Sequence, residues 1–392
     1  MNKIFKYLIL IVSISFAKPS QAQQLSPEAE IRVMTLGPYQ GELYSAFGHS
    51  AFRVYDPARG INIVYNYGVF DFDQENFYLN FVRGKMLYKL GTSRYERFVK
   101  HYVDENRFVY EQVLNLTQEE KQKLMDFLVN NKKPENRDYY YNYVYDNCAT
   151  KIGDVLQEVL GKKLVLDTSF KEDGLTFRGL MDRYLDHQYW GDFGIDLGLG
   201  AGVDKEAAGE EYLFLPDYVY RSFMNSKITD ENGNRPLVAE TDIIFEATPE
   251  VQEKPMLTPF NVLTILFFVI GFLTNIDFKK NRRSKWIDYL FFGLAGLIGW
   301  FLLFLWFGTD HISAWNYNLL WALPTHLIVV FFLRKRDKYR KQLKAYFKWT
   351  SIFYVLLIVI WSFLPQPLHS SLIPLILILT LRGFYLVHDL RR

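Results

Sequence analysis

Apolar residues divide the chain into two unlike parts. Up to about Pro255, polar and charged residues separate short apolar runs, whereas Leu, Ile, Phe, Val and Trp dominate from Leu257 onward. The second part contains five apolar stretches, each near the roughly 20 residues that a helix needs to cross a bilayer. These stretches are 259–276, 286–307, 317–333, 349–364 and 371–388. Because lipid offers no hydrogen-bond partners to a backbone, we predict an all-α bundle of about five transmembrane helices.

The first part alternates between strand-like and helix-like patterns. Thr117 and Glu120 have the spacing of a capping box at the start of a helix. A second helix is predicted after Asn147, with Ile152 on its apolar face and Gly161 at its end. Period-two alternation predicts strands at 31–36, 50–55, 61–67 and 109–116. This mixture predicts an α+β domain ahead of the helical bundle.

A further apolar run, residues 7–16, lies near the N-terminus. It is short for a membrane span, follows Lys3 and Lys6, and precedes small residues that end at Ala22. These features are typical of a secretory signal peptide. The predicted divisions are a signal peptide at 1–22, an exported domain at 23–250 and a membrane domain at 251–392. An uncleaved anchor is the alternative, and it leaves the exported domain on the same side of the membrane.

The loops between the apolar stretches differ in charge. The first loop carries five Lys or Arg residues and the third carries eight, whereas the second (308–316) and the fourth (365–370) carry none. Basic loops tend to stay on the cytoplasmic side of a membrane. The second and fourth loops, together with the exported domain, are therefore predicted to lie outside the cytoplasm.

Composition limits the chemistry that this chain can perform. The formal net charge of the 392 residues is only +2, and no basic stripe is interleaved with aromatic residues, so we predict no nucleic-acid partner. No residues show metal-ligand spacing, and we expect neither a metal nor a cofactor. The single cysteine, Cys148, excludes an intramolecular disulfide. It is an intermolecular bridge, an inert buried thiol or a nucleophile.

A nucleophilic role for Cys148 needs a thiol pKa lowered from about 8.5. The N-terminus of a helix and a nearby imidazole both lower it, and Cys148 is predicted in the first turn of a helix. Among the histidines of the exported domain, His49 is the best partner because small residues flank it. His101 and His187 lie in segments expected to be exposed. On composition alone, an ordinary strand histidine remains the alternative for His49.

Further side chains would support such a pair. A third group should orient the imidazole, and Asn66 on the predicted partner strand is our candidate, ahead of Asn62 and Tyr65. Backbone N–H groups at the start of the helix would form an oxyanion site, with the Asn147 side chain as an additional candidate donor.

The second membrane loop and the residues after it are unusually polar. His311, Asn316 and Asn318 are placed at the outer boundary of the membrane. They are either ordinary solvated residues or contacts to a lipid headgroup or substrate. Asn318 and His326, if they lie within the span, should face the interior of the bundle.

The order of His49 before Cys148 is similar to that of circularly permuted papain-like thiol enzymes. More specifically, segments around both residues resemble the Lnb family of lipoprotein N-acyltransferases. These segments are 47–54, 65–70, 114–117 and 145–150, with 316–321 similar to the membrane part of the family. The resemblance covers nearly the whole chain. Ala149 departs from the Ser or Thr expected there, without removing a catalytic atom.

The resemblance implies a circularly permuted papain-like (NlpC/P60-like) domain in the periplasm, carried by a multi-pass protein of the inner (cytoplasmic) membrane. It implies catalytic roles for Cys148 and His49. The implied reaction moves a phospholipid acyl chain, through a Cys148 thioester, to the α-amine of the N-terminal diacylglyceryl-cysteine of a lipoprotein. Its partners are a phospholipid acyl donor, a lipoprotein acceptor and the lipid bilayer. The rivals are a membrane-tethered cysteine peptidase or amidase acting on cell-wall peptide, and a non-enzymatic envelope scaffold.

Overall fold

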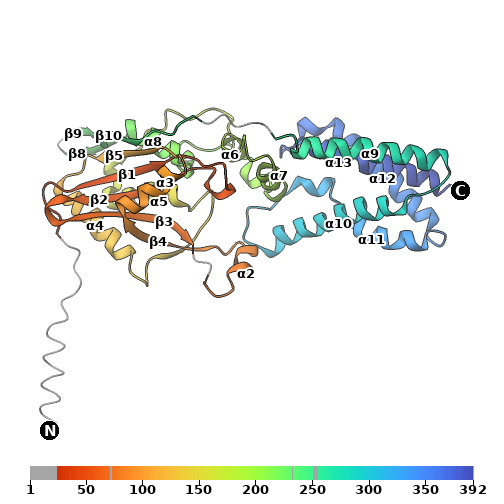
Figure 1. Cartoon of the computed structure of the whole chain (residues 1–392), viewed down its shortest axis with the longest axis horizontal. Coiled ribbons are helices and arrows are strands. Elements are labelled where there is room, and N and C mark those ends of the chain that lie inside the picture. The colour runs from red at the N-terminus through yellow and green to blue at the C-terminus, as the bar shows by residue number, and fades with distance from the viewer. Residues whose placement is uncertain (1–23, 71–72, 232, 250–254, 392) are drawn as a thin grey trace, which may run out of the picture.

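A computed structural model describes residues 24–70, 73–231, 233–249 and 255–391, so the predicted signal peptide lies outside the described residues. Within these ranges, one antiparallel sheet of seven strands organises the N-terminal domain, in the order β10-β5-β1-β2-β3-β4-β6 (Figure 1). The strands are β1 (Glu30–Leu36), β2 (His49–Asp56), β3 (Ile61–Phe70), β4 (Leu87–Arg94), β5 (Val109–Leu114), β6 (Asp138–Tyr140) and β10 (Val238–Phe245). All four strands predicted from alternation are present.

Helices cover both faces of this sheet. On β1, Ile31 and Val33 pack with residues of α4, α5 and α8, while Met34 and Leu36 pack with residues of α3 on the opposite face. The helices are α3 (Tyr95–Asp104), α4 (Gln118–Asn131), α5 (Cys148–Leu160) and α8 (Pro216–Asn225). Successive side chains of a strand point to opposite faces of the sheet, so a strand covered by helices on both faces must carry apolar residues on both. The core therefore has two layers, and α5 lies against β2 and β3.

A smaller apolar cluster extends the N-terminal domain toward the membrane helices. It joins α6 and nearby turns through Phe177, Leu180 and Phe214, and Ile312 from the second membrane loop packs against it. The small sheet of β7 (Leu164–Val165), β8 (Lys227–Asp230) and β9 (Gly233–Pro236) packs instead into the larger core, through Leu164 and Ile228. The helices of the region near the membrane are α6 (Phe177–Asp182) and α7 (Tyr189–Gly198). This region therefore connects the sheet to the C-terminal domain.

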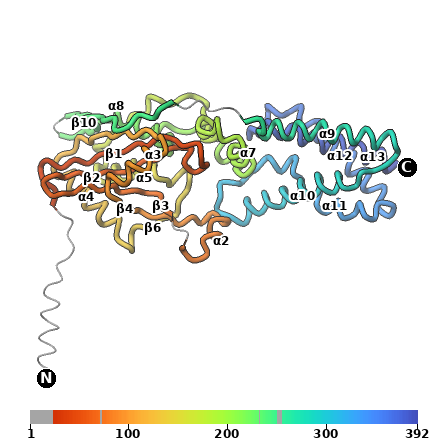
Figure 2. Tube along the Cα trace, in the orientation of Figure 1, coloured from red at the N-terminus to blue at the C-terminus, as the bar shows by residue number. Residues whose placement is uncertain are grey.

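The C-terminal domain is helical, as the apolar stretches predict. Its helices are α9 (Pro259–Lys279), α10 (Lys285–Gly308), α11 (Thr325–Phe332), α12 (Arg340–Val359) and α13 (Leu372–Asp389). In Figure 2, α9, α12 and α13 lie together, with α10 and α11 beside them. Contacts between α12 and α13, between α13 and α9, and between α10 and α11 hold these groups together.

The five predicted membrane spans are not equally long and apolar in the structure. Among the described residues, four helical segments are long and apolar enough to cross a membrane: Pro259–Lys279, Lys285–Gly308, Tyr317–Lys335 and Leu372–Asp389. The missing one was predicted at 349–364. Its residues belong instead to the second half of α12 and a 3-10 turn at Trp361–Phe363. The first half of α12 carries Lys341, Lys344 and Lys348, so the helix as a whole is not apolar enough.

The third span is not a continuous helix. It starts with a 3-10 turn at Tyr317–Leu320, becomes irregular, and resumes at Thr325 directly after Pro324. Proline lacks a backbone N–H and is tolerated only near the start of a helix, so the break falls there. Because it is broken, the segment can approach α10 closely: a Cβ on Gly299 would come within 2.0 Å of the Ala322 carbonyl oxygen. Small residues commonly allow this kind of contact between membrane helices.

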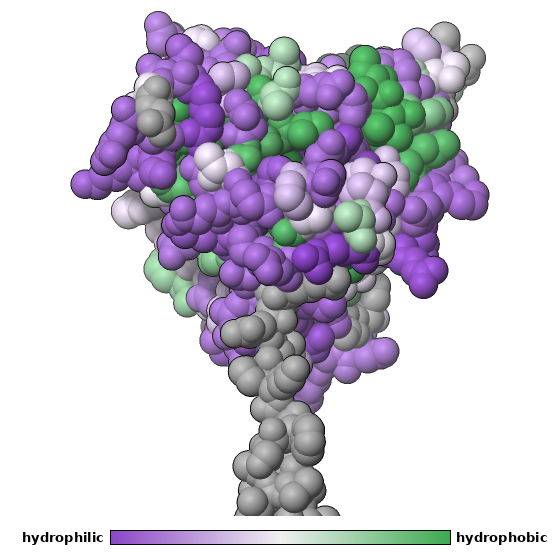
Figure 3. Space-filling view, turned by 90° about the vertical axis from the view of Figure 1, so that its left-hand side faces the viewer, coloured by the Kyte–Doolittle hydropathy of each residue, from purple (hydrophilic) through white to green (hydrophobic). Residues whose placement is uncertain are grey.

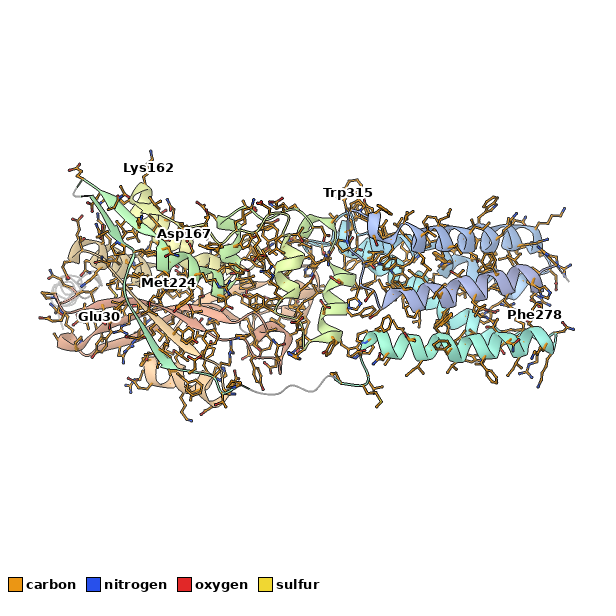
Figure 4. All side chains as sticks on the ribbon, turned by 90° about the horizontal axis from the view of Figure 1, so that it is seen from above. Glu30, Lys162, Asp167, Met224, Phe278 and Trp315 are labelled. Atoms are coloured by element: carbon orange, nitrogen blue, oxygen red, sulfur yellow. The ribbon has the colours of Figure 1, made fainter. Side chains whose placement is uncertain are left out.

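Both loops predicted to lie outside the cytoplasm contact the N-terminal domain. The Gly200 N–H donates to the Ile312 carbonyl at 2.9 Å, and the Gln366 side chain donates to the Leu199 carbonyl at 2.9 Å. Figure 4 shows Trp315 at this junction and Phe278, which precedes the first basic loop, at the opposite end of the helices. The arrangement therefore separates the loops without Lys or Arg from the basic ones.

Candidate active site

The first turn of α5 is built by local hydrogen bonds around Asn147. The Asn147 Oδ1 accepts from the N–H groups of Ala149 (2.8 Å) and Thr150 (3.0 Å), and the Asn147 N–H donates to the Thr150 hydroxyl at 2.8 Å. This reciprocal pattern is a capping box, and it makes Cys148 the first residue of the helix. The partial positive charge of a helix N-terminus favours a thiolate at that position.

The Asn147 amide nitrogen has no hydrogen to spare for an oxyanion. It donates to the Tyr143 carbonyl at 3.0 Å and to the Phe214 carbonyl at 2.8 Å, and the residue is buried. A side-chain amide has two N–H donors, so both are used. Our expectation that Asn147 contributes an oxyanion donor is therefore wrong, because its side chain instead caps α5 and anchors the preceding loop.

His49 lies at the start of β2 and forms a hydrogen bond with the Cys148 side chain. Its Nε2 is 2.5 Å from Asn66 Oδ1, on the neighbouring strand β3. An amide oxygen only accepts, so Nε2 carries a hydrogen in this pair and Nδ1 is the nitrogen left for the thiol. The structure thus brings together the three residues that were predicted separately as nucleophile, base and orienting group.

The charged forms of the Cys148 thiol and the His49 imidazole stabilise one another. Burial alone raises the pKa of the Cys148 thiol, but His49 and N–H groups of Ser50 and Cys148 itself outweigh burial, so the thiol pKa lies below its ordinary value. Burial alone lowers the pKa of the His49 imidazole, but the Cys148 thiolate and the bonds to Cys148 and Asn66 raise it overall. The lowered thiol pKa and the raised imidazole pKa both favour a thiolate–imidazolium pair.

An aromatic ring supports the imidazole from one side. The Tyr102 ring of α3 lies nearly parallel to His49, at an interplanar angle of 10° and a centroid distance of 6.3 Å. The Arg107 guanidinium lies 4.4 Å from the centroid of Tyr102, and its Nε donates to the Gly37 carbonyl at 2.6 Å. Arg107 also opposes the rise in the His49 pKa through its positive charge. The orientation of His49 therefore depends on α3 as well as on β3.

Two residues that the sequence did not single out complete the site. The Tyr141 side chain forms a hydrogen bond with Cys148, and burial followed by the nearby Cys148 charge raises the Tyr141 pKa well above its ordinary value. Its hydroxyl therefore remains a donor. Gly68 has φ +88°, and a Cβ there would lie 3.5 Å from Cys148 Cβ and 3.9 Å from His49 Cε1. A glycine inside a strand pattern predicts a bulge, and the pairing of β3 with β4 does shift between Asn66 and Val69.

Comparison with known families assigns both parts of the chain to one family. A family model described as the Lnb N-terminal periplasmic domain matches residues 18–183, and one described as the Lnb transmembrane domain matches residues 251–392. The chain belongs to the Lnb family. No match was found among curated proteins or among solved structures. Family membership makes this a membrane protein with a periplasmic N-terminal part, and it associates the chain with lipoprotein processing.

The polar residues at the start of the third span do not face a substrate. The Asn316 amide donates to the Leu197 carbonyl at 2.8 Å, and the Asn318 amide donates to the Asp196 carbonyl at 2.9 Å, so both side chains bind α7. Both residues are buried. The expected substrate contact is therefore wrong for these two asparagines, which join the Lnb transmembrane domain to the periplasmic domain. His311 is exposed, and its Nε2 donates to the Phe81 carbonyl at 3.1 Å.

The other two histidines of the periplasmic domain, His101 and His187, are exposed, as expected. His326 is fully buried in the helical domain and bonds to Tyr346 and Tyr354, so it faces the interior of the bundle as expected. Of these three, none takes the position of His49 beside the thiol.

One group of side chains has the spacing of a metal site. Asp192 and Asp196 on α7 and His369 from the loop before α13 bring their ligand atoms within 4.8 Å of one another. However, the His369 Nδ1 accepts from the Ser371 N–H at 3.1 Å, so its proton sits on the Nε2 that faces Asp192 at 3.3 Å. A histidine that binds a metal normally donates through its other nitrogen. The group fits a hydrogen-bonded link between the two domains better than a metal site.

Proposed function

We propose that this protein is a lipoprotein N-acyltransferase that uses Cys148 as nucleophile and His49 as acid and base. The observation that supports this most is the His49 imidazole held between the Cys148 thiol and Asn66 Oδ1, in a periplasmic domain joined directly to membrane helices. A nucleophile, a base and a group that orients the base are the parts that a thiol acyl-transfer site requires.

The first step acylates the enzyme. The Cys148 thiolate attacks an ester carbonyl of a phospholipid, a C–S bond forms, and the C–O bond to the glycerol breaks. The His49 imidazolium gives its proton to the departing oxygen, which leaves as a lysophospholipid. The developing negative charge on the carbonyl oxygen is stabilised by the Cys148 N–H and by the Tyr141 hydroxyl, which replaces Asn147 as the side-chain donor in this proposal. The next two N–H groups of α5, those of Ala149 and Thr150, already donate to Asn147 Oδ1.

The second step transfers the acyl chain. The free α-amine of the diacylglyceryl-cysteine attacks the thioester carbonyl, a C–N bond forms and the C–S bond breaks. Neutral His49 takes the amine proton, which restores the thiolate–imidazolium pair. The thioester divides a difficult ester-to-amide exchange into two easier steps.

The location of the domain suits these substrates. Donor and acceptor both lie in a bilayer, and a site held at its surface raises their effective concentration. The proposal includes a multi-pass protein of the inner membrane, a cleaved signal peptide, and a circularly permuted papain-like (NlpC/P60-like) relationship for the periplasmic domain. The order of His49 before Cys148 and the position of Cys148 at a helix N-terminus support that relationship.

The decisive experiment is mass spectrometry of lipoprotein N-termini from cells that carry the wild type, Cys148→Ser or, as a control, His187→Ala. We expect an amide-linked acyl chain with the wild type and with His187→Ala, and its loss with Cys148→Ser. An unchanged acyl chain in Cys148→Ser would refute the proposal. Cleavage of cell-wall peptide by the purified protein, without any acyl adduct on Cys148, would favour the peptidase instead.

A further inference from the structure

A short helix at the membrane side of the periplasmic domain leaves most of its apolar side chains uncovered. Helix α2 (Phe77–Val82) lies between β3 and β4. Its exposed fractions are 78% for Tyr78, 55% for Leu79, 49% for Phe81 and 46% for Val82. A contiguous exposed apolar patch on a soluble domain usually marks a surface that contacts something else.

The backbone fixes α2 at the outer end of a membrane span. The Asp310 N–H donates to the Arg83 carbonyl at 2.9 Å, directly after α2. His311 bonds to the Phe81 carbonyl, as described above. Gly84 lies so close to this loop that a Cβ on it would be 2.8 Å from the His311 backbone nitrogen. Asp310 and His311 follow α10, a candidate span that ends at Gly308, and Figure 1 shows α2 beside this loop.

The surroundings of α2 match the boundary between lipid and water. Phe307 at the end of α10 and Trp315 in the same loop are exposed, and aromatic side chains of this kind collect at membrane interfaces. Arg83 and Lys85 are exposed beside α2, and the segment 77–85 contains no acidic residue. An apolar face flanked by basic residues is typical of a helix that lies in the headgroup region. By contrast, Figure 3 shows a mostly hydrophilic surface at the end of the periplasmic domain away from the membrane helices.

A run of aromatic rings connects this region to the thiol. Phe70 and Tyr88 are opposite each other where β3 and β4 pair, with ring centroids 5.6 Å apart. Tyr88 stacks on Tyr141 at 4.3 Å, and Tyr141 bonds to Cys148. β4 therefore leads from the end of α2 toward Cys148, and its Tyr88 ring contacts both Phe70 of β3 and Tyr141 after β6.

We propose that α2 lies in the outer-leaflet interface and contacts phospholipid, and that the apolar side chains of α2, followed by the rings of Phe70, Tyr88 and Tyr141, guide one acyl chain from there to Cys148. The membrane contact stands on the exposure and position of α2. The guiding role rests in addition on the acyltransferase function proposed above.

The depth of α2 in the membrane can be measured in a variant that lacks the nucleophile. Cys148→Ser removes the only cysteine, so Leu79→Cys in that background accepts a single nitroxide label. The matched control is Glu119→Cys, at an exposed residue of α4, and Figure 1 shows α4 at the end of the periplasmic domain away from the membrane helices. In vesicles of phosphatidylethanolamine and phosphatidylglycerol, we expect the label at 79 to collide mainly with oxygen, and the label at 119 mainly with a water-soluble nickel complex. Equal access of the nickel complex to both labels would overturn the membrane contact.

The guiding role is tested with Cys148 intact. The triple variant Tyr78→Ser, Leu79→Ser and Phe81→Ser should slow thioester formation from bilayer phospholipid by about tenfold, because the lipid is less well positioned. Met224→Ser, an exposed apolar residue on α8, is the control and should leave the rate unchanged. Thermal unfolding and thiol labelling of Cys148 check that the triple variant is folded.

The outcomes separate the two proposals. If the wild type forms a thioester and the folded triple variant forms it equally fast, the guiding role is wrong. If the wild type forms no thioester with any phospholipid, the proposed function fails and the guiding role fails with it, while the nitroxide measurement still decides whether α2 contacts lipid.

Discussion

His49 and His326 are each bonded through both ring nitrogens, yet their surroundings differ in kind. His49 lies between Asn66 Oδ1 and the Cys148 thiol. His326, inside the helical domain, lies between the hydroxyl groups of Tyr346 and Tyr354, and Tyr354 in turn donates to the Trp321 carbonyl at 2.8 Å. Full hydrogen bonding is thus common to both, although His326 is fully buried and His49 only partly.

The difference lies in what the partners can do. A thiol that loses its proton becomes a nucleophile, whereas the Tyr346 and Tyr354 hydroxyls complete a closed network that satisfies buried polar groups. A second buried polar network lies near the basic loops, where Arg382 binds Asp288 at 2.8 Å and Asp277 at 2.9 Å. In the helical domain, therefore, buried polar groups join helices, and in the periplasmic domain one such group is positioned for chemistry.

The largest expected effect concerns the two histidines. His49→Ala should lower the rate of acyl-thioester formation by about 10²–10⁴-fold, because it removes the proton donor and acceptor, while the protein remains folded. Intact-protein mass spectrometry after exposure to phospholipid vesicles measures the adduct. His326→Phe should instead lower thermal stability and leave acylation per folded molecule close to that of the wild type. The contrast between the two histidines fails if His49→Ala acylates as fast as His326→Phe.

Loss of the buried arginine should act on stability alone. Arg382→Met leaves Asp277 without its cation, and breaking a buried pair in this way costs about 3–5 kcal/mol. Thermal unfolding of the purified protein in detergent measures the loss, and Arg336→Met, on a partly exposed pair with Asp389, is the control with a smaller effect. A loss no larger than that of Arg336→Met would show that the cluster is not an important joint between helices.

The pH dependence of thiol reactivity should report the charge pair at Cys148. Because the thiol pKa is lowered, its thiolate persists to lower pH, and alkylation should fall only as the pH drops through that lowered value. In His49→Ala the midpoint should move up toward about 8.5, the value of an ordinary thiol. A methanethiosulfonate reagent followed over pH 5–10 makes the measurement. Identical midpoints in the two proteins would mean that His49 does not stabilise the thiolate.

The smallest effect distinguishes two glycines that both have positive φ. Gly68→Ala and Gly60→Ala each place a Cβ on a residue with left-handed backbone conformation, which should lower the free energy of unfolding by about 1–2 kcal/mol. Nothing lies within 4 Å of the new Cβ at Gly60, whereas at Gly68 it would touch Cys148 and Tyr141. Both variants should lose similar stability, but only Gly68→Ala should also slow acylation. Equal rates in the two variants would show that the close approach at Gly68 is not needed.

Much of the candidate site could be predicted because its parts are local. The cap that puts Cys148 at the first position of α5 involves only residues 147–150, and the pairing of His49 with Asn66 follows from two strands joined by a short turn. Tyr141 was missed because it reaches Cys148 through the β6 edge of the sheet, and the tyrosine-rich segment around it shows no pattern that distinguishes one ring from another.

The sequence by itself determined the division of the chain, the separation of basic loops from loops without Lys or Arg, and the strand and helix that carry His49 and Cys148. These depend on periodicity, charge and capping, which act over a few residues. Only the tertiary structure decided that Asn316 and Asn318 bind α7, that Asn147 has no free donor, and that α2 meets the loop after α10. These contacts join residues far apart in the chain, and they depend on how whole elements pack, which no local pattern records.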